Sequence, residues 1–335
     1  MKLLRIIGLP VAFVYGLIIH MRNYLFDAGI LKSKSFQTPT VCVGNLSLGG
    51  TGKTPMVEFL VEALHYHIKV AVLSRGYKRK SSGYVVADAN STVDTLGDEP
   101  FQIHKKFKQI TLAVDSDRIN GITTLEKTVS PSLIILDDAF QHRKVKPDFS
   151  ILLTAFNNYY SDDYFLPYGT LRDSKNQAKR AQVIVVTKCP QELSLDKRMA
   201  IKERLKPLEN QKVLFSFLAY NNRIKGLSKE TTLDEIKNHN ITLVTGIANP
   251  LPLMDYLRSK DLNFEHLRFK DHHDFSANEI RNLNSKDFVL TTEKDFVRLQ
   301  GKVEELAYVE MAHQFMDDGK EQLIVELKKA TKLNF

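Results

Sequence analysis

A glycine-rich segment at residues 44–55, with the sequence GNLSLGGTGKTP, contains the residue types that bind phosphate. Glycines let backbone N–H groups curl around phosphate oxygens, and the start of a following helix adds its positive dipole. Lys53 is expected to reach the outer phosphates, and the Thr54 hydroxyl to bind Mg²⁺. The segment therefore predicts a P-loop, although Ser47 stands where the usual pattern has its first glycine. The predicted nucleotide-binding residues are Gly49, Gly50, Thr51, Gly52, Lys53 and Thr54.

An ordinary glycine-rich turn between a strand and a helix is the alternative, so the flanking residues matter. Residues 40–43 are a β-branched run of the kind found in buried strands. After the glycines, apolar residues recur at helical spacing, at Met56, Val57, Leu60, Val61 and Leu64. Strand, loop and helix follow in the order that a P-loop requires, which favours phosphate binding over a plain turn.

A second phosphate-related pattern lies at the end of another predicted strand. Residues 133–136 are apolar and lead into Asp137 and Asp138, as in a Walker B strand whose carboxylate meets Mg²⁺. Side chains alternate along a strand, so both aspartates can face one metal ion only if the strand has already turned. We assign Asp138 to Mg²⁺, together with Thr54.

Asp98 and Glu99 are adjacent carboxylates directly before a predicted helix at residues 101–107. Carboxylates at this position often cap a helix or stabilise its dipole, which is the structural interpretation. The chemical interpretation is that one of them accepts a proton, because an alcohol is a poor nucleophile until a nearby base removes its proton.

The second half of the chain contributes two polar clusters, Asp271-His272-His273 and TTEKD at residues 291–295. Adjacent histidines on a strand point to opposite sides, and no third ligand has suitable spacing, so a metal site is not favoured. A solvated loop is the alternative for the first cluster, and His273 is expected to be structural. In the second cluster, Thr292, Lys294 and Asp295 are expected to help hold the nucleotide.

Three arginines, Arg75, Arg118 and Arg172, follow or flank predicted strand ends in the first half. A lone arginine is usually a solvated or salt-bridged surface residue. The guanidinium fork also fits phosphate, and we expect these arginines to bind phosphate of either the nucleotide or the acceptor.

Strands alternate with helices along the whole chain, which predicts an α/β fold with a doubly wound, mostly parallel sheet. In the first half the predicted strands are residues 40–43, 69–73, 110–114, 133–136 and 149–153. The pattern restarts near residue 181, with strands predicted at residues 183–187, 213–218, 241–245, 267–269 and 288–291. We predict an N-terminal helix in residues 1–22, a nucleotide-binding domain in 23–180 and a second α/β domain in 181–335.

Residues 3–19 are almost wholly apolar, with Arg5 near the start and Arg22 after the run. A signal peptide has this shape, but no small-residue cleavage site follows. A spanning helix needs about 20 apolar residues, and this run is shorter and is broken by Pro10. A helix lying in the membrane interface fits best, and a buried core helix is the alternative.

The chain has 335 residues, of which 43% are hydrophobic and 26% are charged. This composition is typical of globular proteins, and the length is sufficient for two domains. Its net charge of +8 suits anionic lipid or a phosphorylated substrate. Without an RNA-reading motif, zinc spacing or a long basic block, the sequence does not favour nucleic acid. Cys42 and Cys189 lie in separate apolar runs, which indicates a reducing compartment rather than a disulfide framework. No obligate protein partner is inferred.

Taken together, these motifs resemble the tetraacyldisaccharide 4′-kinases, the lipid A 4′-kinases of Gram-negative bacteria, over nearly the whole chain. The resemblance rests on an ordered set of segments, and the serine-for-glycine P-loop variant is part of it. The segments are GNLSLGGTGKTP (44–55), SRGY (74–77), GDEP (97–100), DR (117–118), DDAFQH (137–142), LPYGTLRD (166–173), GIANP (246–250), DHH (271–273) and TTEKD (291–295).

The resemblance implies ATP-dependent phosphorylation of the 4′-hydroxyl of a tetraacylated disaccharide 1-phosphate. It implies two α/β/α domains joined by a small β linker, and peripheral attachment to the cytoplasmic face of the bacterial inner membrane through the N-terminal helix. Asp98 would be the base, His272 would orient it, and Glu99 would lie near Mg²⁺. The predicted acceptor-binding residues are Asn45, Arg75, Tyr77, Arg118, Gln141, His142 and Arg172.

Asp98 and His272 lie in different predicted domains, so we expect the cleft between the domains to close and bring them together. Two other functions remain open at this point. A membrane-surface P-loop ATPase acting as a partner switch would explain the P-loop and the N-terminal helix, but not the Asp98/His272 pair. A soluble small-molecule kinase would require residues 3–19 to be buried in the core.

Overall fold

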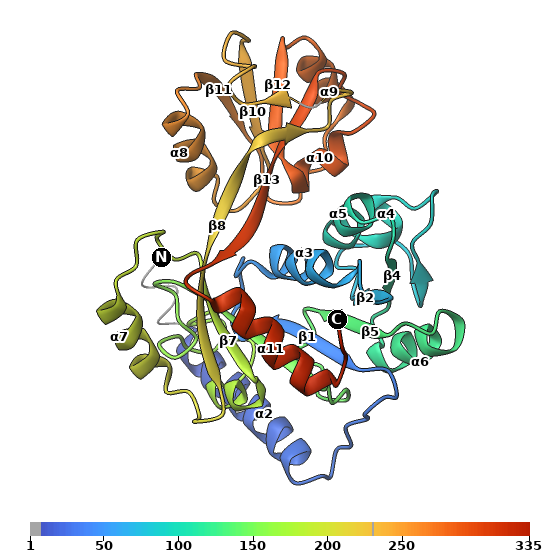
Figure 1. Ribbon diagram of the computed structural model, residues 1–335, viewed down its shortest axis with the longest axis vertical. Coiled ribbons are helices and arrows are strands. Elements are labelled where there is room, and N and C mark those ends of the chain that lie inside the picture. The colour runs from blue at the N-terminus through green and yellow to red at the C-terminus, as the bar shows by residue number, and fades with distance from the viewer. Residues whose placement is uncertain (1–7, 230) are drawn as a thin grey trace.

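The computed structural model describes residues 8–229 and 231–335, so Arg5, predicted to lie at the membrane interface, is outside the described residues. A larger and a smaller β-sheet are joined by two long antiparallel strands, β8 (Lys212–Lys225) and β13 (Leu306–Phe315) (Figure 1). Both sheets are mostly parallel and carry helices, which confirms the predicted α/β fold.

The larger sheet has the strand order β3-β4-β2-β5-β1-β6-β7-β8. Its strands are parallel apart from β3, which lies antiparallel to β4 at the edge. Val43 of β1 pairs with Asp137 of β5, so the P-loop and the acidic strand end leave the sheet side by side. The strands are Thr40–Asn45 (β1), Val70–Ser74 (β2), Val85–Val86 (β3), Thr111–Val114 (β4), Leu133–Asp137 (β5), Phe149–Ala155 (β6) and Val183–Thr187 (β7).

The smaller sheet has the order β11-β10-β12-β13-β8, with β9 paired to β8. The strands β10, β11 and β12 are parallel to one another, and β13 runs parallel to β12 but antiparallel to β8. Every residue of β10 is buried, as expected where helices cover both faces of a parallel sheet. The remaining strands are Thr231–Thr232 (β9), Ile241–Thr245 (β10), Phe264–Arg268 (β11) and Phe288–Thr292 (β12).

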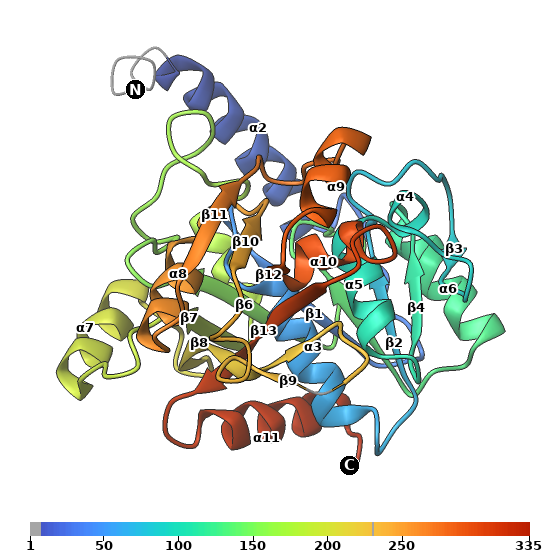
Figure 2. The ribbon, with the colours of Figure 1, turned by 90° about the horizontal axis from the view of Figure 1, so that it is seen from above.

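Helices cover both faces of the larger sheet. Apolar residues of α3, α5 and α11 share one core, whereas those of α6 and α7 share the core on the opposite face. From the smaller unit, α10 contacts α5 of the larger one (Figure 2). The helices are Leu9–Asp27 (α2), Lys53–Leu64 (α3), Val93–Leu96 (α4), Asp98–Lys106 (α5), Arg118–Thr128 (α6), Lys175–Arg180 (the 3-10 helix η1), Leu195–Leu205 (α7), Leu251–Ser259 (α8), Ala277–Asn284 (α9), Glu293–Leu299 (α10) and Gly319–Thr331 (α11).

The change from one unit to the other does not fall at residue 181, where the sequence pattern restarts. Strand β7 pairs with β6 in the larger sheet, and α11 packs back onto that sheet from the end of the chain. The chain instead changes sheets within β8 and β13. A repeating pattern of apolar runs shows where strands lie, but it does not show which strands pair. The β13 strand was not predicted, and β11 lies slightly earlier than the predicted residues 267–269.

Helix α2 buries only a narrow stripe, formed by Ala12, Gly16, Ile19 and Asn23 at spacings of four and three residues. A Cβ atom at Gly16 would lie 2.7 Å from the Phe165 ring, so glycine allows this close approach. Large apolar side chains elsewhere on the helix are exposed, including Phe13 at 72%. Among the described residues, α2 is the one helix long and apolar enough to cross a membrane, a test that core helices and signal sequences also pass. Its exposure argues against the core-helix alternative.

Candidate active site

The P-loop connects β1 to α3 in the predicted order. Gly49 and Gly52 have φ angles of +110° and +86°, which strain residues other than glycine. Gly52 caps α3, and its carbonyl accepts the N–H of Met56 at 3.1 Å. The N–H groups of the first helical turn have no partner within the helix, so they are available to an anion.

Asn45, at the end of β1, organises the polar side chains around the P-loop. Its Nδ2 donates to Thr51 Oγ1 at 2.9 Å, and its Oδ1 accepts from Lys53 Nζ at 3.4 Å and from Arg172. Lys53 Nζ also lies 3.7 Å from Asp138 Oδ1. Arg172 donates to the two oxygens of Asp138 at 2.8 and 3.1 Å. Two predicted phosphate ligands and one predicted metal ligand therefore meet in one cluster.

The two adjacent aspartates have different surroundings. Asp137 is buried and accepts a hydrogen bond from Ser74 Oγ at 2.8 Å. Burial and the charge of Asp138 raise the pKa of Asp137 to about 6. Asp138 follows the strand with φ +46°, so the chain has turned. Burial opposes ionisation of Asp138, but the hydrogen bond from Arg172 and the charge of Lys53 lower its pKa. Asp138 is therefore the aspartate that faces the P-loop lysine.

The atoms predicted to coordinate Mg²⁺ are oxygens, which this ion prefers as ligands. Thr54 lies in the first turn of α3, and Asp138 lies beside Lys53 at the neighbouring strand end. Within residues 8–229 and 231–335, no group of three or more His, Cys, Asp or Glu side chains could hold a metal ion. A hydroxyl and one carboxylate suit an ion that completes its coordination with water and nucleotide phosphates.

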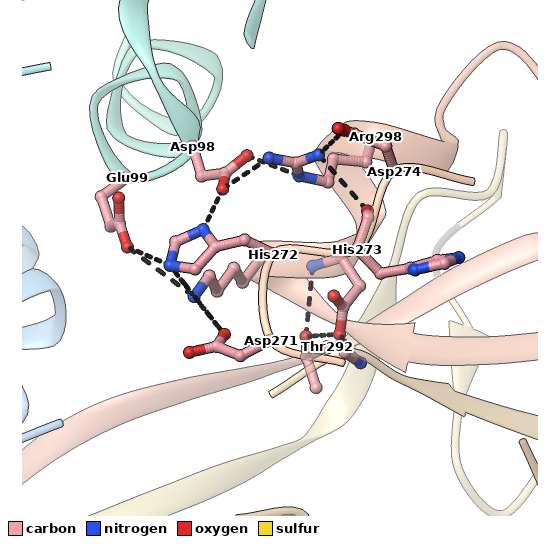
Figure 3. A network of polar contacts seen from close by, with 11 residues as sticks. Asp98, Glu99, Asp271, His272, His273, Asp274, Thr292 and Arg298 are labelled. Carbon is pink, nitrogen blue, oxygen red and sulfur yellow. Dashed lines mark hydrogen bonds and ion pairs between the residues drawn. The ribbon is translucent and has the colours of Figure 1, made fainter. Parts of the chain in front are cut away.

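Asp98 is the first residue of α5 and is 1% exposed. Its Oδ2 hydrogen-bonds to Nδ1 of His272, which belongs to the smaller unit (Figure 3). Arg298 of α10 donates from Nε to Oδ1 at 2.6 Å and from Nη2 to Oδ2 at 2.8 Å. The contact predicted between Asp98 and His272 is therefore present, and it joins the two units.

Opposing effects act on the pKa of Asp98. Burial raises it, but hydrogen bonds from His272 and Arg298, together with the Arg298 charge, lower it to about 2. Asp98 is consequently ionised at neutral pH, and both of its carboxylate oxygens accept hydrogen bonds. Arg298 was not predicted from the sequence. It lies four residues after Lys294, a spacing that places both side chains on one side of α10 and could have identified it.

The other ring nitrogen of His272 faces a mixed-charge group. Its Nε2 lies 3.1 Å from Lys294 Nζ and 3.9 Å from Glu99 Oε1. Lys294 Nζ in turn lies 2.8 Å from Asp271 Oδ1 and 3.8 Å from Glu99 Oε1. Lys294, predicted to bind nucleotide, therefore lies beside His272. Glu99, predicted to lie near Mg²⁺, also lies beside His272 (Figure 3).

A cavity of about 280 Å³ opens beside the Asp98–His272 contact, at the junction of the two units. Tyr77 lines it, with its ring edge-on to His272 at a centroid distance of 6.0 Å. The cavity gives a substrate access to the pair. Its lining residues are Tyr77, Lys78, Lys80, Val93, Asp94, Gly97, Asp98, His272, Asp274 and Arg298.

Two of the predicted arginines differ sharply in exposure. Arg118 is 2% exposed, and its guanidinium donates to the backbone carbonyls of Asp115 and Asp137. This placement favours a structural role and does not support the predicted contact with phosphate. Arg75 is exposed at the end of β2, where its charge is open to a ligand.

Two other predicted residues, Gln141 and Thr292, make hydrogen bonds in or near the site, and a third, His142, is half-buried. Gln141 Nε2 donates to the carbonyl of Asn45 at 2.5 Å. Burial and the charges of neighbouring arginines lower the pKa of His142 to about 4, so its ring is neutral. The Thr292 side chain accepts from the Asp295 N–H at 3.2 Å and caps α10, which gives it a structural task beside the predicted one.

Known proteins with this sequence and fold share one description. A family model described as tetraacyldisaccharide-1-P 4′-kinase matches residues 4–329. The tetraacyldisaccharide 4′-kinase of Flavobacterium johnsoniae is 47% identical, over 95% of this chain and 94% of that protein. The enzyme of the same name from Bacteroides thetaiotaomicron is 44% identical, over 87% of this chain and 82% of that protein.

A solved structure also matches this chain over nearly its whole length. The crystal structure of LpxK from Aquifex aeolicus, described as an "apo" form in complex with ATP, matches with a TM-score of 0.79. It is 29% identical in sequence, and the match covers 97% of this chain and 99% of that one. These matches extend over both units and include the P-loop and the Asp98–His272 pair. The chain therefore belongs to the tetraacyldisaccharide-1-P 4′-kinase family.

Proposed function

We propose that this protein transfers the γ-phosphoryl group of ATP to the 4′-hydroxyl of tetraacyldisaccharide 1-phosphate, a step of lipid A biosynthesis. The hydroxyl oxygen forms a bond to the γ-phosphorus, the bond to the β,γ-bridging oxygen breaks, and ADP leaves. The hydroxyl proton passes to a base on the protein. The observation that carries the proposal is the Asp98–His272 contact at a cavity between the units, in a chain with a P-loop and this family membership.

Two groups of residues divide the work. The P-loop N–H groups and Lys53 bind and orient the phosphates, and Arg172 is available to bind phosphate once it releases Asp138. Thr54 and Asp138 would hold Mg²⁺, which supplies neutralisation of phosphate charge when bound. The Asp98–His272 pair receives the proton as a unit. Oδ2 of Asp98 accepts two hydrogen bonds and Oδ1 accepts one, so a lone pair on Oδ1 remains for the proton, because each carboxylate oxygen has two lone pairs.

The acceptor is an acylated lipid, and we propose that α2 brings the protein to the membrane that holds it. Phe13 and Leu17 of α2 are 72% and 61% exposed, and burial of such side chains in the lipid interface is favourable. The net charge of +8 adds attraction to anionic headgroups. Peripheral attachment to the cytoplasmic face of the bacterial inner membrane places the enzyme beside both ATP and its lipid substrate.

The direct test incubates the full-length protein with MgATP and tetraacyldisaccharide 1-phosphate in mixed micelles. Mass spectrometry should show the acceptor gaining one phosphate, with ADP formed in equal amount. Lys53→Ala is the control, and its kcat/KM should fall by roughly a thousandfold, since the lysine neutralises transferring phosphate. ATP hydrolysis without phosphorylated lipid would contradict the kinase assignment and support the partner-switch ATPase.

A further inference from the structure

A buried histidine outside the predicted site contacts the P-loop from the strand that joins the two units. His313 of β13 lies with Nε2 2.9 Å from the Gly52 carbonyl oxygen and Nδ1 3.1 Å from Ser216 Oγ. A carbonyl can only accept, so Nε2 carries the hydrogen and Nδ1 accepts from the serine hydroxyl. Burial lowers the pKa of His313 to about 4, which keeps the ring neutral near neutral pH.

The neighbouring P-loop carbonyl is held in the same way. Thr187, the last residue of β7, donates its hydroxyl to the Thr51 carbonyl at 2.8 Å. In a planar trans peptide, the C=O and the following N–H point in opposite directions. A bond that fixes the carbonyl of Thr51 therefore also fixes the N–H of Gly52. The Gly52 carbonyl already accepts the N–H of Met56 at 3.1 Å, and the second bond from His313 restrains it further, and with it the N–H of Lys53.

The loop packs directly on the His313 ring. A Cβ atom at Gly52 would lie 2.9 Å from His313 Nε2 and 3.1 Å from Cε1, so a side chain there would displace the ring. Gly52 thus has two reasons to be glycine, its φ of +86° and this approach. His313 is also fixed from behind by Ser216, and its strand pairs with β8 at this level, with His313 opposite Leu218.

We propose that His313 is a positioning residue for the nucleotide site, with Thr187 acting on the preceding peptide group. The two side chains hold the carbonyls outward so that the N–H groups of Gly52 and Lys53 face the nucleotide phosphates. The inference rests on the proposed function only in taking ATP as the ligand. Since β13 continues into the smaller unit, the bond also ties the P-loop to the strand that carries that unit.

The experiment compares His313→Leu, which removes the donor, with His313→Gln, which can return an N–H to the same place. Gln314→Leu is the matched control, because Gln314 is the exposed neighbour on the same strand. Calorimetry with the non-hydrolysable analogue AMPPNP and Mg²⁺ gives the nucleotide Kd, steady-state kinetics give kcat and the acceptor KM, and thermal unfolding gives Tm. Thr187→Val, which removes only the hydroxyl donor, is a second variant should His313→Leu fold poorly.

We expect His313→Leu to weaken AMPPNP binding about tenfold, a typical consequence of losing one buried hydrogen bond that orders a site. The acceptor KM should stay within about twofold, His313→Gln should recover most of the affinity, and Thr187→Val should weaken binding severalfold. Unchanged nucleotide affinity in both His313→Leu and Thr187→Val would overturn the inference, as would a glutamine variant as weak as the leucine one. Failure of the unsubstituted protein to bind AMPPNP would instead contradict the proposed function.

Discussion

Arg298 and Asp98 form a two-point ion pair across the junction of the two units, with N–O distances of 2.6 and 2.8 Å. The same guanidinium also contacts Asp274 and donates to the His273 carbonyl at 3.3 Å. Arg298 therefore joins the start of α5 to the loop that carries His272. It fixes the plane of the Asp98 carboxylate, and through it the orientation of the imidazole.

The first prediction concerns the pH dependence of activity in Arg298→Met. Hydrogen bonds from His272 and Arg298 keep the pKa of Asp98 at about 2, so loss of Arg298 must raise this pKa. The acid limb of the kcat–pH profile should move to higher pH. We also expect kcat at neutral pH to fall by roughly 10- to 100-fold, because the carboxylate loses its fixed orientation.

Arg258→Met is the control for this variant, since Arg258 forms an exposed pair with Asp255 on α8. Its pH profile should match that of the unsubstituted protein. If Arg298→Met lowers Tm but leaves the acid limb in place, Arg298 supports the fold without tuning Asp98.

Much of this site could be predicted from the sequence, but for different reasons in each part. The P-loop follows from glycines, Lys53 and the strand–helix context, because local backbone geometry fixes phosphate binding. The Asp98–His272 pairing came from the family motifs, since nothing local shows that residues 174 positions apart will touch. The spacing from Lys294 places Arg298 on the same side of α10, but its contact with Asp98 is tertiary. His313 was missed because it lies on β13, which was not predicted.

The second prediction tests whether Asp98 and His272 work as a unit. Asp98→Ala and His272→Ala should each lower kcat strongly, and the double variant should be little worse than the more damaged single variant. Residues that share one step show such non-additive losses, whereas independent residues multiply their effects. Steady-state kcat for the four proteins, at saturating ATP and acceptor, gives the coupling. Losses that multiply would separate the two residues into distinct roles.

The third prediction concerns stability at a buried charge cluster between the units. Lys106 of α5 lies 2.7 Å from Glu58, 3.2 Å from Glu293 and 3.2 Å from Glu310. Burial and the charge of Glu58 raise the pKa of Glu293 from 4.5 to about 8. In this range the folded protein holds a proton that the unfolded chain releases, so the contribution of Glu293 to the free energy of unfolding falls as pH rises from 4.5 to 8.

Glu293→Gln cannot ionise and should flatten this decline. Urea unfolding at several pH values should show the variant gaining stability relative to the unsubstituted protein as pH rises through the window. Glu321→Gln on α11 is the control, because Glu321 is exposed and should leave the slope unchanged. Parallel stability curves for Glu293→Gln and the unsubstituted protein would show that Glu293 is ionised in both states.

The last prediction concerns membrane attachment through α2. Phe13 and Leu17 are four residues apart on the helix and largely exposed, so both can enter one lipid interface. Burial of each side chain is worth about 1.5–3 kcal/mol, and the Phe13→Ser, Leu17→Ser variant should bind anionic phosphatidylglycerol vesicles at least about tenfold more weakly. Its acceptor KM should rise in vesicles, while its AMPPNP Kd should stay the same, because the side chains of Phe13 and Leu17 are exposed rather than packed against the nucleotide site. Tyr66→Ser provides the control, since Tyr66 is 76% exposed at the far end of α3 and should not affect sedimentation with vesicles. Equal sedimentation of the α2 variant and the unsubstituted protein would show that the exposed face of α2 does not carry the attachment.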